Sequence, residues 1–360
     1  TRSGFPSIEY PDNDAGRIDE LLRSPRYGFE VKKLWDGGAE NAQPTRANIL
    51  REIEDFLIRD AKPGDVEIFY YSGHGASIAN TASNEPDKRD ETIVPIDASR
   101  PKIDAAAWAK LSESQRLEAF ATQFRDIRDK ELVELFNRIL AKGVTLTVIL
   151  DSCHSGSAAR GEERAKEVEP IDLDIRIAPR PEQLLAPDQN GALVLTAAKD
   201  YQVAGGGTYE IGGVEARYSH FTAALLNTLY DTPADLLSAN ELFAELTARM
   251  ESDGRTTQSP NIDGSPSRLG RTLFGTPQRP LGRVTAQLGI DHGEAFLRAG
   301  LADGLNTGDE LRRIDGKTGK AATPAVTLRV KRAGIDKSEI EITQGTRAAL
   351  AVDQTFEQFR

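Results

Sequence analysis

The 360-residue chain contains one cysteine, one methionine, two tryptophans and four histidines. A single cysteine excludes an internal disulfide framework and, with so few histidines, a cysteine-rich zinc site. A reducing compartment, namely the cytoplasm, is therefore expected. No run of about 18 apolar residues predicts a membrane-spanning helix. Residues 1–16 also lack the basic start and the apolar stretch of a signal peptide.

The charge is unbalanced toward acid, with 45 Lys and Arg against 56 Asp and Glu, a net charge of −11. Because no extended Lys/Arg tract occurs, the sequence argues against nucleic acid as a partner. An acidic chain is compatible with basic substrates, although such a balance usually serves only solubility. The length allows one large domain with a small one beside it.

Alternating helical and extended patterns predict an α/β domain with a mostly parallel sheet, ending near Phe274. The predicted helices are 15–22, 45–59, 115–142, 221–230 and 239–250, and the predicted strands are 66–71, 92–96, 144–150 and 192–197. Residues 157–190 are charged and contain prolines, which predicts an exposed linker. From Gly282 onward Thr/Val alternation and turn residues indicate a separate β domain. We place the two domains at residues 1–278 and 279–360.

Two predicted strands end in small, polar and reactive residues. VEIFYYSGHGAS contains His74, and VTLTVILDSCHSGS contains Cys153. Loops at the carboxyl ends of parallel strands meet at one edge of the sheet, where ligands bind. An imidazole near a thiol makes it a nucleophile, and glycines beside His74 let backbone N–H groups approach a substrate carbonyl. Alone, Cys153 reads as a buried apolar residue and His74 as part of a tight turn; together they favour catalysis.

The motifs YYSGHG and DSCHSG resemble the metacaspase branch of the caspase-like cysteine peptidases. Further similar stretches are DETIVPID at 90–97, IRDKEL at 127–132, LTAAKDYQVA at 195–204 and SHFTAALL at 219–226. The resemblance covers residues 5–275. It implies a caspase-like α/β/α sandwich whose first strand is expected before Thr1.

The resemblance also implies the roles of the catalytic residues. His74 would be the general base and Cys153 the nucleophile, and the N–H groups of Gly75 and Cys153 would form the oxyanion hole. Two other histidines are weaker candidates for the base. His154 points away from Cys153 on an extended backbone, and His220 precedes an apolar helix and is expected to pack there.

The expected substrates are proteins or peptides with Arg or Lys at P1, the residue before the cleaved bond. Asp151 lies two residues before Cys153, on the same face of the strand. A carboxylate there favours a basic P1 side chain through charge-assisted hydrogen bonds. The resemblance adds Asp14 and Ser72 to the same S1 pocket. The alternative for Asp14 is a cap of the following helix.

Many metacaspases are activated by calcium, which binds six to eight oxygens. The resemblance makes Asp90 and Asp129 candidate ligands, within or near an acidic loop at 87–91 that also reads as a solvated surface. However, Lys130 and Arg160 stand where the family pattern has acids. The sequence therefore predicts no metal and no cofactor.

The predicted linker carries five basic residues: Arg160, Arg164, Lys166, Arg176 and Arg180. A peptidase with an acidic S1 pocket could cut itself at these positions. Exposed linkers are also commonly charged for solubility alone, so the sequence supports both interpretations equally.

Two other functions compete with an Arg/Lys-specific cysteine endopeptidase. One is a caspase-like regulatory or binding scaffold with dormant peptidase activity, which binds a regulatory protein through its C-terminal β domain. The other is a cysteine hydrolase of small esters or amides, which has no use for an acidic group at Asp151. The presence of both His74 and Cys153 favours the peptidase.

Overall fold

The computed structural model describes residues 5, 8–153, 166, 168–199, 202, 204–253, 258–278, 284–291, 293–316, 318 and 320–358. The chain divides into two compact units. The first consists of Thr1–Thr228 with Ser238–Thr276, and the second of Leu229–Leu237 with Pro277–Arg360.

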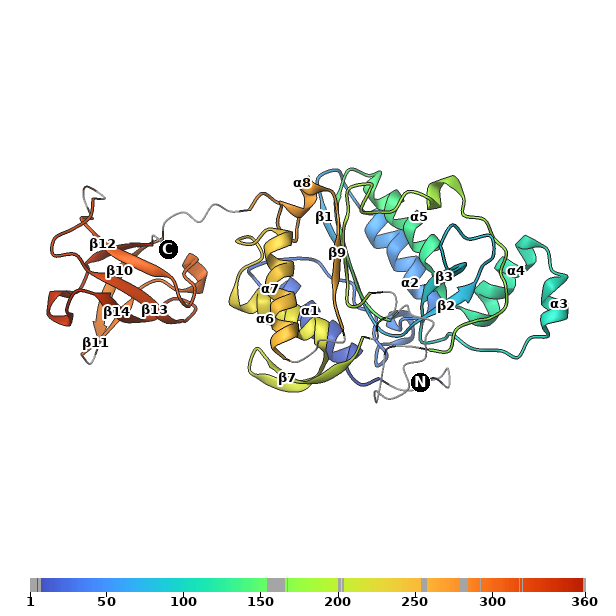
Figure 1. Ribbon diagram of the computed structural model, residues 1–360, viewed down its shortest axis with the longest axis horizontal. Coiled ribbons are helices and arrows are strands. Elements are labelled where there is room, and N and C mark those ends of the chain that lie inside the picture. The colour runs from blue at the N-terminus through green and yellow to red at the C-terminus, as the bar shows by residue number, and fades with distance from the viewer. Residues whose placement is uncertain are drawn as a thin grey trace. The chain divides into compact units, whose positions relative to one another are not determined.

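A four-stranded sheet lies at the centre of the first unit (Figure 1). Its strands, in spatial order, are β1 (Val66–Ser72), β5 (Thr145–Asp151), β6 (Leu193–Thr196) and β9 (Asn261–Asp263). The first three strands are parallel and β9 is antiparallel to β6. A parallel sheet covered on both faces favours apolar strands, which explains the apolar run Val148–Leu150 within β5. The predicted mostly parallel α/β sheet is confirmed.

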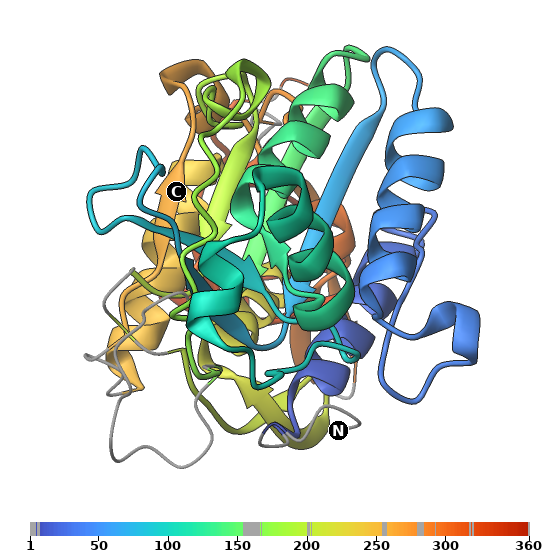
Figure 2. The ribbon, with the colours of Figure 1, turned by 90° about the vertical axis from the view of Figure 1, so that its right-hand side faces the viewer.

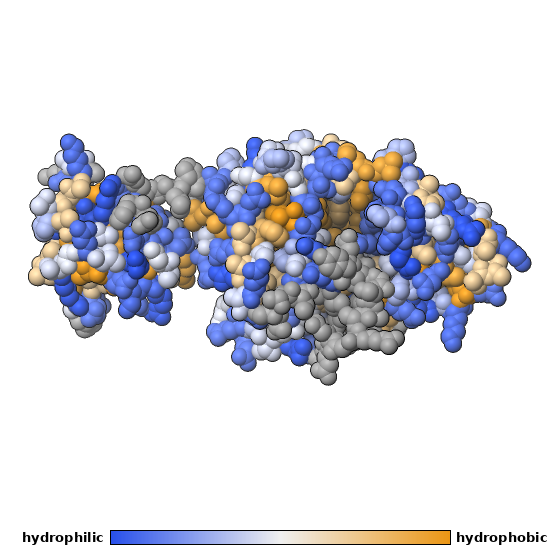
Figure 3. Space-filling model, in the orientation of Figure 1, coloured by the Kyte–Doolittle hydropathy of each residue, from blue (hydrophilic) through white to orange (hydrophobic). Residues whose placement is uncertain are grey.

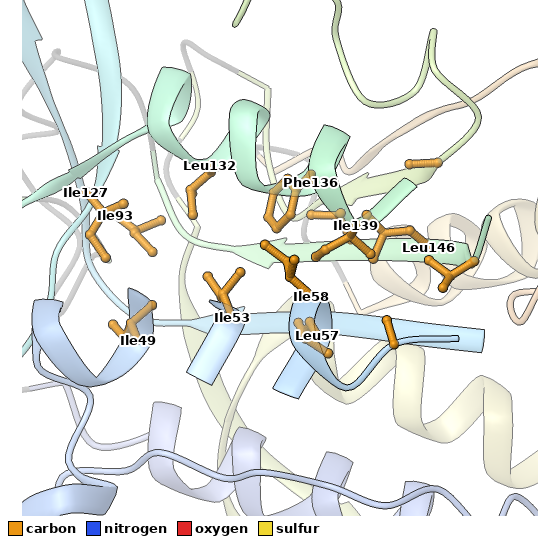
Figure 4. Packing of buried hydrophobic residues seen from close by; sticks show 14 residues of the cluster. Ile49, Ile53, Leu57, Ile58, Ile93, Ile127, Leu132, Phe136, Ile139 and Leu146 are labelled. Carbon is orange, nitrogen blue, oxygen red and sulfur yellow. The ribbon is translucent and has the colours of Figure 1, made fainter. Parts of the chain in front are cut away.

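Helices cover both faces of this sheet. On one face lie α2 (Arg46–Glu52), its π-helical continuation η2 (Ile53–Arg59) and α5 (Asp129–Leu140), beside β1 (Figure 2). Figure 4 shows Ile53 and Ile58 pointing toward Leu132 and Phe136 in a single apolar cluster. On the other face lie α1 (Pro11–Arg23), α6 (His220–Asp231) and α7 (Ala239–Ser252) (Figure 1).

A three-stranded antiparallel sheet follows the end of β1. It contains β2 (Gly75–Ala79), β3 (Arg89–Ile93) and β4 (Ile127–Arg128). The helices α3 (Ala105–Ala109), α4 (Glu113–Ala119) and η3 (Phe120–Phe124) come between β3 and β4 in the chain. Ile78 packs with Trp108 and Phe120 in a buried cluster, so β2 and these helices share one core.

The helix predicted over 115–142 is wrong as a single element, because β4 separates η3 from α5. Two ion pairs explain the break. Buried Asp126 pairs with Arg100 at 2.8 Å, and buried Arg128 pairs with Asp90 at 2.9 Å. Burying these charges is favourable only with their partners in place, and those partners lie far away in sequence. Tertiary pairing therefore overrides local helix propensity.

The exposed linker predicted over 157–190 is also wrong for residues 168–178. This segment runs parallel to β2, where Ile171 makes backbone hydrogen bonds of 2.8 and 2.9 Å with the strand. Ile171, Ile175 and Ile177 are buried. Their burial holds the segment on the molecule, and the short helix η4 (Pro181–Gln183) follows it.

A β-hairpin precedes α6. Its strands are β7 (Gly206–Ile211) and β8 (Val214–Ser219), joined by Gly212 and Gly213, both with positive φ. A two-residue turn with two positive φ values favours glycine at both positions. The remaining short helices of this unit are η1 (Glu40–Ala42) and α8 (Pro266–Leu269).

The second unit contains a closed antiparallel barrel, which confirms the predicted small β domain. Its strands, in spatial order, are β10 (Thr285–Asp291), β11 (Glu294–Leu297), β14 (Ser338–Gln344), β13 (Thr327–Ala333), β12 (Glu310–Ile314) and β15 (Thr355–Gln358). Leu288, Leu328 and Phe356 are fully buried in its core. The short helices η5 (Leu301–Asp303) and η6 (Arg347–Ala349) lie in its connections.

Hydrophilic residues cover most of the face in Figure 3, and hydrophobic residues form small patches between them. Among the described helices, none combines the length and the hydropathy needed to cross a bilayer.

Candidate active site

The loops that carry His74 and Cys153 begin at the same edge of the central sheet. β1 and β5 are parallel neighbours, and Ser72 is paired in register with Asp151. The backbone N–H of Gly73 then donates to the Asp151 carbonyl at 3.2 Å. This is the arrangement expected from two parallel strands ending side by side.

The two loops touch at Gly75. A Cβ atom built on Gly75 would lie 1.7 Å from the carbonyl oxygen of Cys153, so only glycine fits at this position. His74 is 8% exposed and Cys153 is 0% exposed. The His74 carbonyl accepts hydrogen bonds from the Tyr71 hydroxyl (2.7 Å) and the Val94 N–H (3.0 Å), which hold the histidine loop in place.

The sulfur of Cys153 lies against the backbone of Ala204. Cys153 Sγ accepts a hydrogen bond from the Ala204 N–H at 2.8 Å and lies 3.5 Å from the Ala204 carbonyl oxygen. Ala204 lies two residues before β7 of the hairpin. Sequence reasoning missed Ala204, because an alanine backbone carries no chemical signal in a sequence.

The three residues predicted to line S1 lie together. We call them the acidic cluster: Asp14, Ser72 and Asp151. Ser72 Oγ donates to Asp14 Oδ2 at 2.7 Å, and Asp14 Oδ1 accepts the Ser219 N–H at 3.0 Å. Asp14 lies inside the first turn of α1, which begins at Pro11. The alternative role as a helix cap is therefore wrong, because this carboxylate is directed to partners outside its own helix.

Burial dominates the electrostatics of Asp14. Loss of water raises the pKa of the Asp14 carboxyl to about 7, with a further upward contribution from Asp151. A nearby lysine, Lys166, and the hydrogen bonds from Ser72 and Ser219 oppose this rise. Two buried carboxylates side by side disfavour full ionisation unless a cation joins them.

Lys166 supplies that cation. Its side chain is fully buried, and Nζ lies 2.7 Å from Asp151 Oδ1 and 3.6 Å from Asp14 Oδ2. The ammonium also donates to Ser72 Oγ and to the Asp151 carbonyl, both at 2.8 Å. It lies 5.4 Å from the centre of the Tyr10 ring. The sequence placed Lys166 in an exposed linker, so its burial among these acids is a correction.

Two hydroxyl groups position the second oxygen of Asp151. Ser219 Oγ and Thr222 Oγ1 both donate to Asp151 Oδ2, the latter at 2.6 Å. Thr222 Oγ1 is also hydrogen-bonded to Tyr70 OH at 2.6 Å. The stretch SHFTAALL carries part of the family resemblance, but its sequence indicates no role for these hydroxyls, because serine and threonine at the start of a helix usually serve as caps.

The calcium candidates have internal cations as partners. Asp90 pairs with Arg128 at 2.9 Å, and Asp129 pairs with Lys130 at 3.0 Å. Lys130 also pairs with Glu85 at 2.5 Å. Burial raises the pKa of Asp129 to about 7 despite the opposing effect of Lys130. Within the described ranges, no group of three or more His, Cys, Asp or Glu side chains is arranged to hold a metal ion.

The remaining sequence candidates are two histidines and four arginines. His220, the first residue of α6, is hydrogen-bonded through Nδ1 to the hydroxyl of Tyr209 in β7 at 2.7 Å, so its ring contacts the hairpin. Arg176 and Arg180 have side chains 54% and 58% exposed. His154, Arg160 and Arg164 lie outside the residues that the structure describes.

Helices on both faces of a mostly parallel sheet define an α/β/α sandwich, the class to which caspase-like folds belong. Cys153 and His74 follow the ends of two neighbouring strands of this sheet. The sequence profile described as "Caspase domain" matches residues 4–269, more than half of the chain. The chain therefore belongs to the caspase-domain family of peptidases, and its fold is the caspase fold.

Curated relatives are fungal metacaspases. The chain is 38% identical over 152 residues to Metacaspase-1 of Coccidioides immitis, covering 41% of this chain and 27% of the relative. It is 38% identical over 117 residues to Metacaspase-1A of Aspergillus fumigatus (32% and 22%), and 37% identical over 140 residues to Metacaspase-1B of Neurospora crassa (38% and 27%). The chain thus matches about a quarter of the length of these relatives.

A solved structure of a Geobacter sulfurreducens protein aligns with a TM-score of 0.49 and 20% identity, over 77% of this chain and 93% of that one.

Proposed function

We propose that this chain is a cysteine endopeptidase that cleaves proteins after Arg or Lys, with Cys153 as nucleophile and His74 as general base. Membership of the caspase-domain family supports the peptidase chemistry. One observation carries the specificity: the acidic cluster beside the Cys153 strand binds an ammonium group, that of Lys166, through an ion pair and two hydrogen bonds.

In the proposed reaction, His74 accepts the proton of the Cys153 thiol, and the thiolate adds to the carbonyl carbon after the basic residue. The developing oxyanion accepts hydrogen bonds from the N–H groups of Gly75 and Cys153. His74 then returns the proton to the departing amine, and the C–N bond breaks. Water hydrolyses the thioester, which releases the new carboxylate and restores the thiol.

Asp151 is the principal determinant of the basic specificity. Its Oδ2 is held by Ser219 and Thr222, so Oδ1 is left to face a cation. A preorganised, buried carboxylate binds a guanidinium or ammonium strongly, because little reorganisation is needed. A carboxylate at P1 would instead meet two buried acids, which is unfavourable.

We further propose that activity is independent of calcium. The carboxylates that the family resemblance points to, Asp90 and Asp129, already neutralise Arg128 and Lys130. A calcium ion would have to displace these tethered cations from buried positions, which disfavours binding.

A fluorogenic peptide with P1 arginine tests the proposal on wild type, Cys153→Ala, His74→Ala and Lys166→Ala, each with calcium and with a chelator. We expect either catalytic substitution to reduce kcat/KM by about a thousandfold or more. His292→Ala, outside the caspase-domain match, is the control and should keep full activity. The chelator should change activity less than twofold, and a strict calcium requirement would contradict the proposed independence.

If neither wild type nor Lys166→Ala cleaves the peptide, with calcium or with the chelator, the proposed peptidase activity is rejected and the dormant scaffold is favoured. Turnover that survives Cys153→Ala would reject the assigned nucleophile. Rapid hydrolysis of small neutral esters without cleavage of basic peptides would favour the small-molecule hydrolase instead.

A further inference from the structure

We propose that Lys166 is an internal occupant of the substrate site, placed where the P1 residue of a substrate binds, so that the chain folds in a self-blocked form. This inference rests on the proposed Arg/Lys specificity. It identifies what the acidic cluster holds before a substrate arrives, and what must leave for catalysis to begin.

The side chain of Lys166 is bound as a ligand would be. An ammonium has three donors, and three acceptors lie within 2.7–2.8 Å of Nζ: Asp151 Oδ1, Ser72 Oγ and the Asp151 carbonyl. Asp14 adds a second negative charge at 3.6 Å. A fully buried lysine costs free energy unless it is paired and hydrogen-bonded, and each of these conditions is met here.

The backbone of Lys166 provides independent support. Its carbonyl oxygen accepts a hydrogen bond of 2.9 Å from the Gly75 N–H. This N–H is one of the two groups that we assign to the oxyanion hole. Its own N–H donates to the Ala204 carbonyl at 3.2 Å. The N–H of Ala204 donates to Cys153 Sγ at 2.8 Å, so both backbone partners of Lys166 also lie against the nucleophile.

A purely structural lysine would need only its acidic partners. It would not also need backbone hydrogen bonds to Gly75 and to Ala204, the residue whose N–H contacts the Cys153 sulfur. The chain after Lys166 is anchored as well, because Val168 N–H donates to the Gly75 carbonyl at 3.0 Å and Ile171 pairs with β2. A substrate therefore cannot reach Asp151 and the Gly75 N–H together until Lys166 has left.

The block predicts competition between Lys166 and an external basic residue. If the open form is a minor fraction of molecules, the apparent Kd of a substrate is raised by the inverse of that fraction. Removing the Lys166 side chain should abolish this increase in the apparent Kd. Replacing Lys166 by arginine should preserve the increase, because a guanidinium has the same charge and more donors.

Binding is best measured in a Cys153→Ala background, where neither turnover nor self-cleavage occurs. The probe is a fluorescent peptide with P1 arginine, compared with the same peptide carrying norleucine. We expect Lys166→Ala to lower the Kd of the arginine peptide by about tenfold or more. Lys166→Arg and the exposed control Arg176→Ala should leave it unchanged. An unchanged or higher Kd in folded Lys166→Ala would overturn the proposal.

Lys166→Ala leaves two buried acids without their cation and could unfold, so thermal unfolding provides a second readout. n-Butylguanidinium should raise the Tm of Lys166→Ala, or restore its folding. It should change neither the Tm of Lys166→Met, whose aliphatic stem still fills the pocket, nor that of the Cys153→Ala parent. Equal effects on all three proteins would overturn the proposal.

Two outcomes distinguish the block by Lys166 from the peptidase activity. Equal KM values for wild type and Lys166→Ala, with cleavage after arginine in both, would reject the block and keep the peptidase. Stabilisation of Lys166→Ala by n-butylguanidinium without cleavage of any basic peptide would reject the peptidase and keep Lys166 as the occupant.

Discussion

Ser72 and Asp151 are paired residues at the ends of two parallel strands, and both contact the same ammonium group. Their side chains point to the same face because paired residues of neighbouring strands share an orientation. Strand pairing thus brings together groups from distant parts of the chain, and α1 adds Asp14 from a third part.

Asp151→Asn should remove the preference for basic substrates. The amide keeps the size of the side chain but loses the negative charge that we propose attracts a P1 arginine. We expect kcat/KM for an arginine peptide to fall by about a hundredfold or more, with a much smaller change for a norleucine peptide. Asp172→Asn, whose side chain is 84% exposed, is the matched control. A peptide panel in which wild type prefers P1 aspartate would contradict the assignment.

Gly75→Ala should abolish both activity and the close contact between the two loops. Because the added Cβ would lie 1.7 Å from the Cys153 carbonyl oxygen, one backbone must move. We expect a loss of about 2 kcal/mol or more in the free energy of unfolding, measured by urea denaturation.

Gly16→Ala is the control for that experiment. Gly16 lies inside α1, and nothing lies within 4 Å of an added Cβ. Alanine should stabilise the helix by about 0.5–1 kcal/mol. A fully active, undestabilised Gly75→Ala protein would show that the described contact between the loops is not required.

We expect self-cleavage after basic residues in the segment that follows Cys153. Arg176 and Arg180 have side chains more than half exposed, whereas Lys166 is enclosed. Intact-mass analysis of wild type should therefore show fragments that are absent from Cys153→Ala. Fragments common to both proteins would come from other proteases, and wild type that stays intact while cleaving added peptides would contradict the prediction.

Glu67→Gln should stabilise the protein at alkaline pH. Glu67 lies in β1 and is 8% exposed, and its Oε2 has no hydrogen-bond partner among the residues that the structure describes. Burial, with a smaller contribution from Asp65, raises its pKa from 4.5 to about 7. Between these values the folded chain holds a proton that the unfolded chain has lost, so stability falls as pH rises across this window.

Glutamine cannot ionise, so it avoids the loss of stability that accompanies ionisation of the buried Glu67 carboxyl. We expect the free energy of unfolding of Glu67→Gln to exceed that of wild type by about 1–3 kcal/mol at pH 8, and by little at pH 4. Glu30→Gln, at a side chain 75% exposed, should show no such pH dependence. Urea unfolding at both pH values measures the difference, and equal gains at pH 4 and pH 8 would contradict the assigned pKa.

The sequence alone was sufficient for the strands that carry the site. Apolar β-branched runs are local signals, so β1, β5 and β6 could be predicted close to their observed ends. The placement of His74 and Cys153 at neighbouring strand ends followed, because parallel strands share one carboxyl edge. The motifs around them also carried the family resemblance.

Tertiary structure alone decided which charges meet. Arg128 breaks a predicted helix because its partner Asp90 lies on β3, and Lys166 leaves a predicted linker because its partners lie on α1, β1 and β5. Local propensity contains no information about such pairs, since the free energy comes from burying both charges together. A lysine that the sequence shows only as one more charge is therefore, in the folded chain, the cation at the centre of the site.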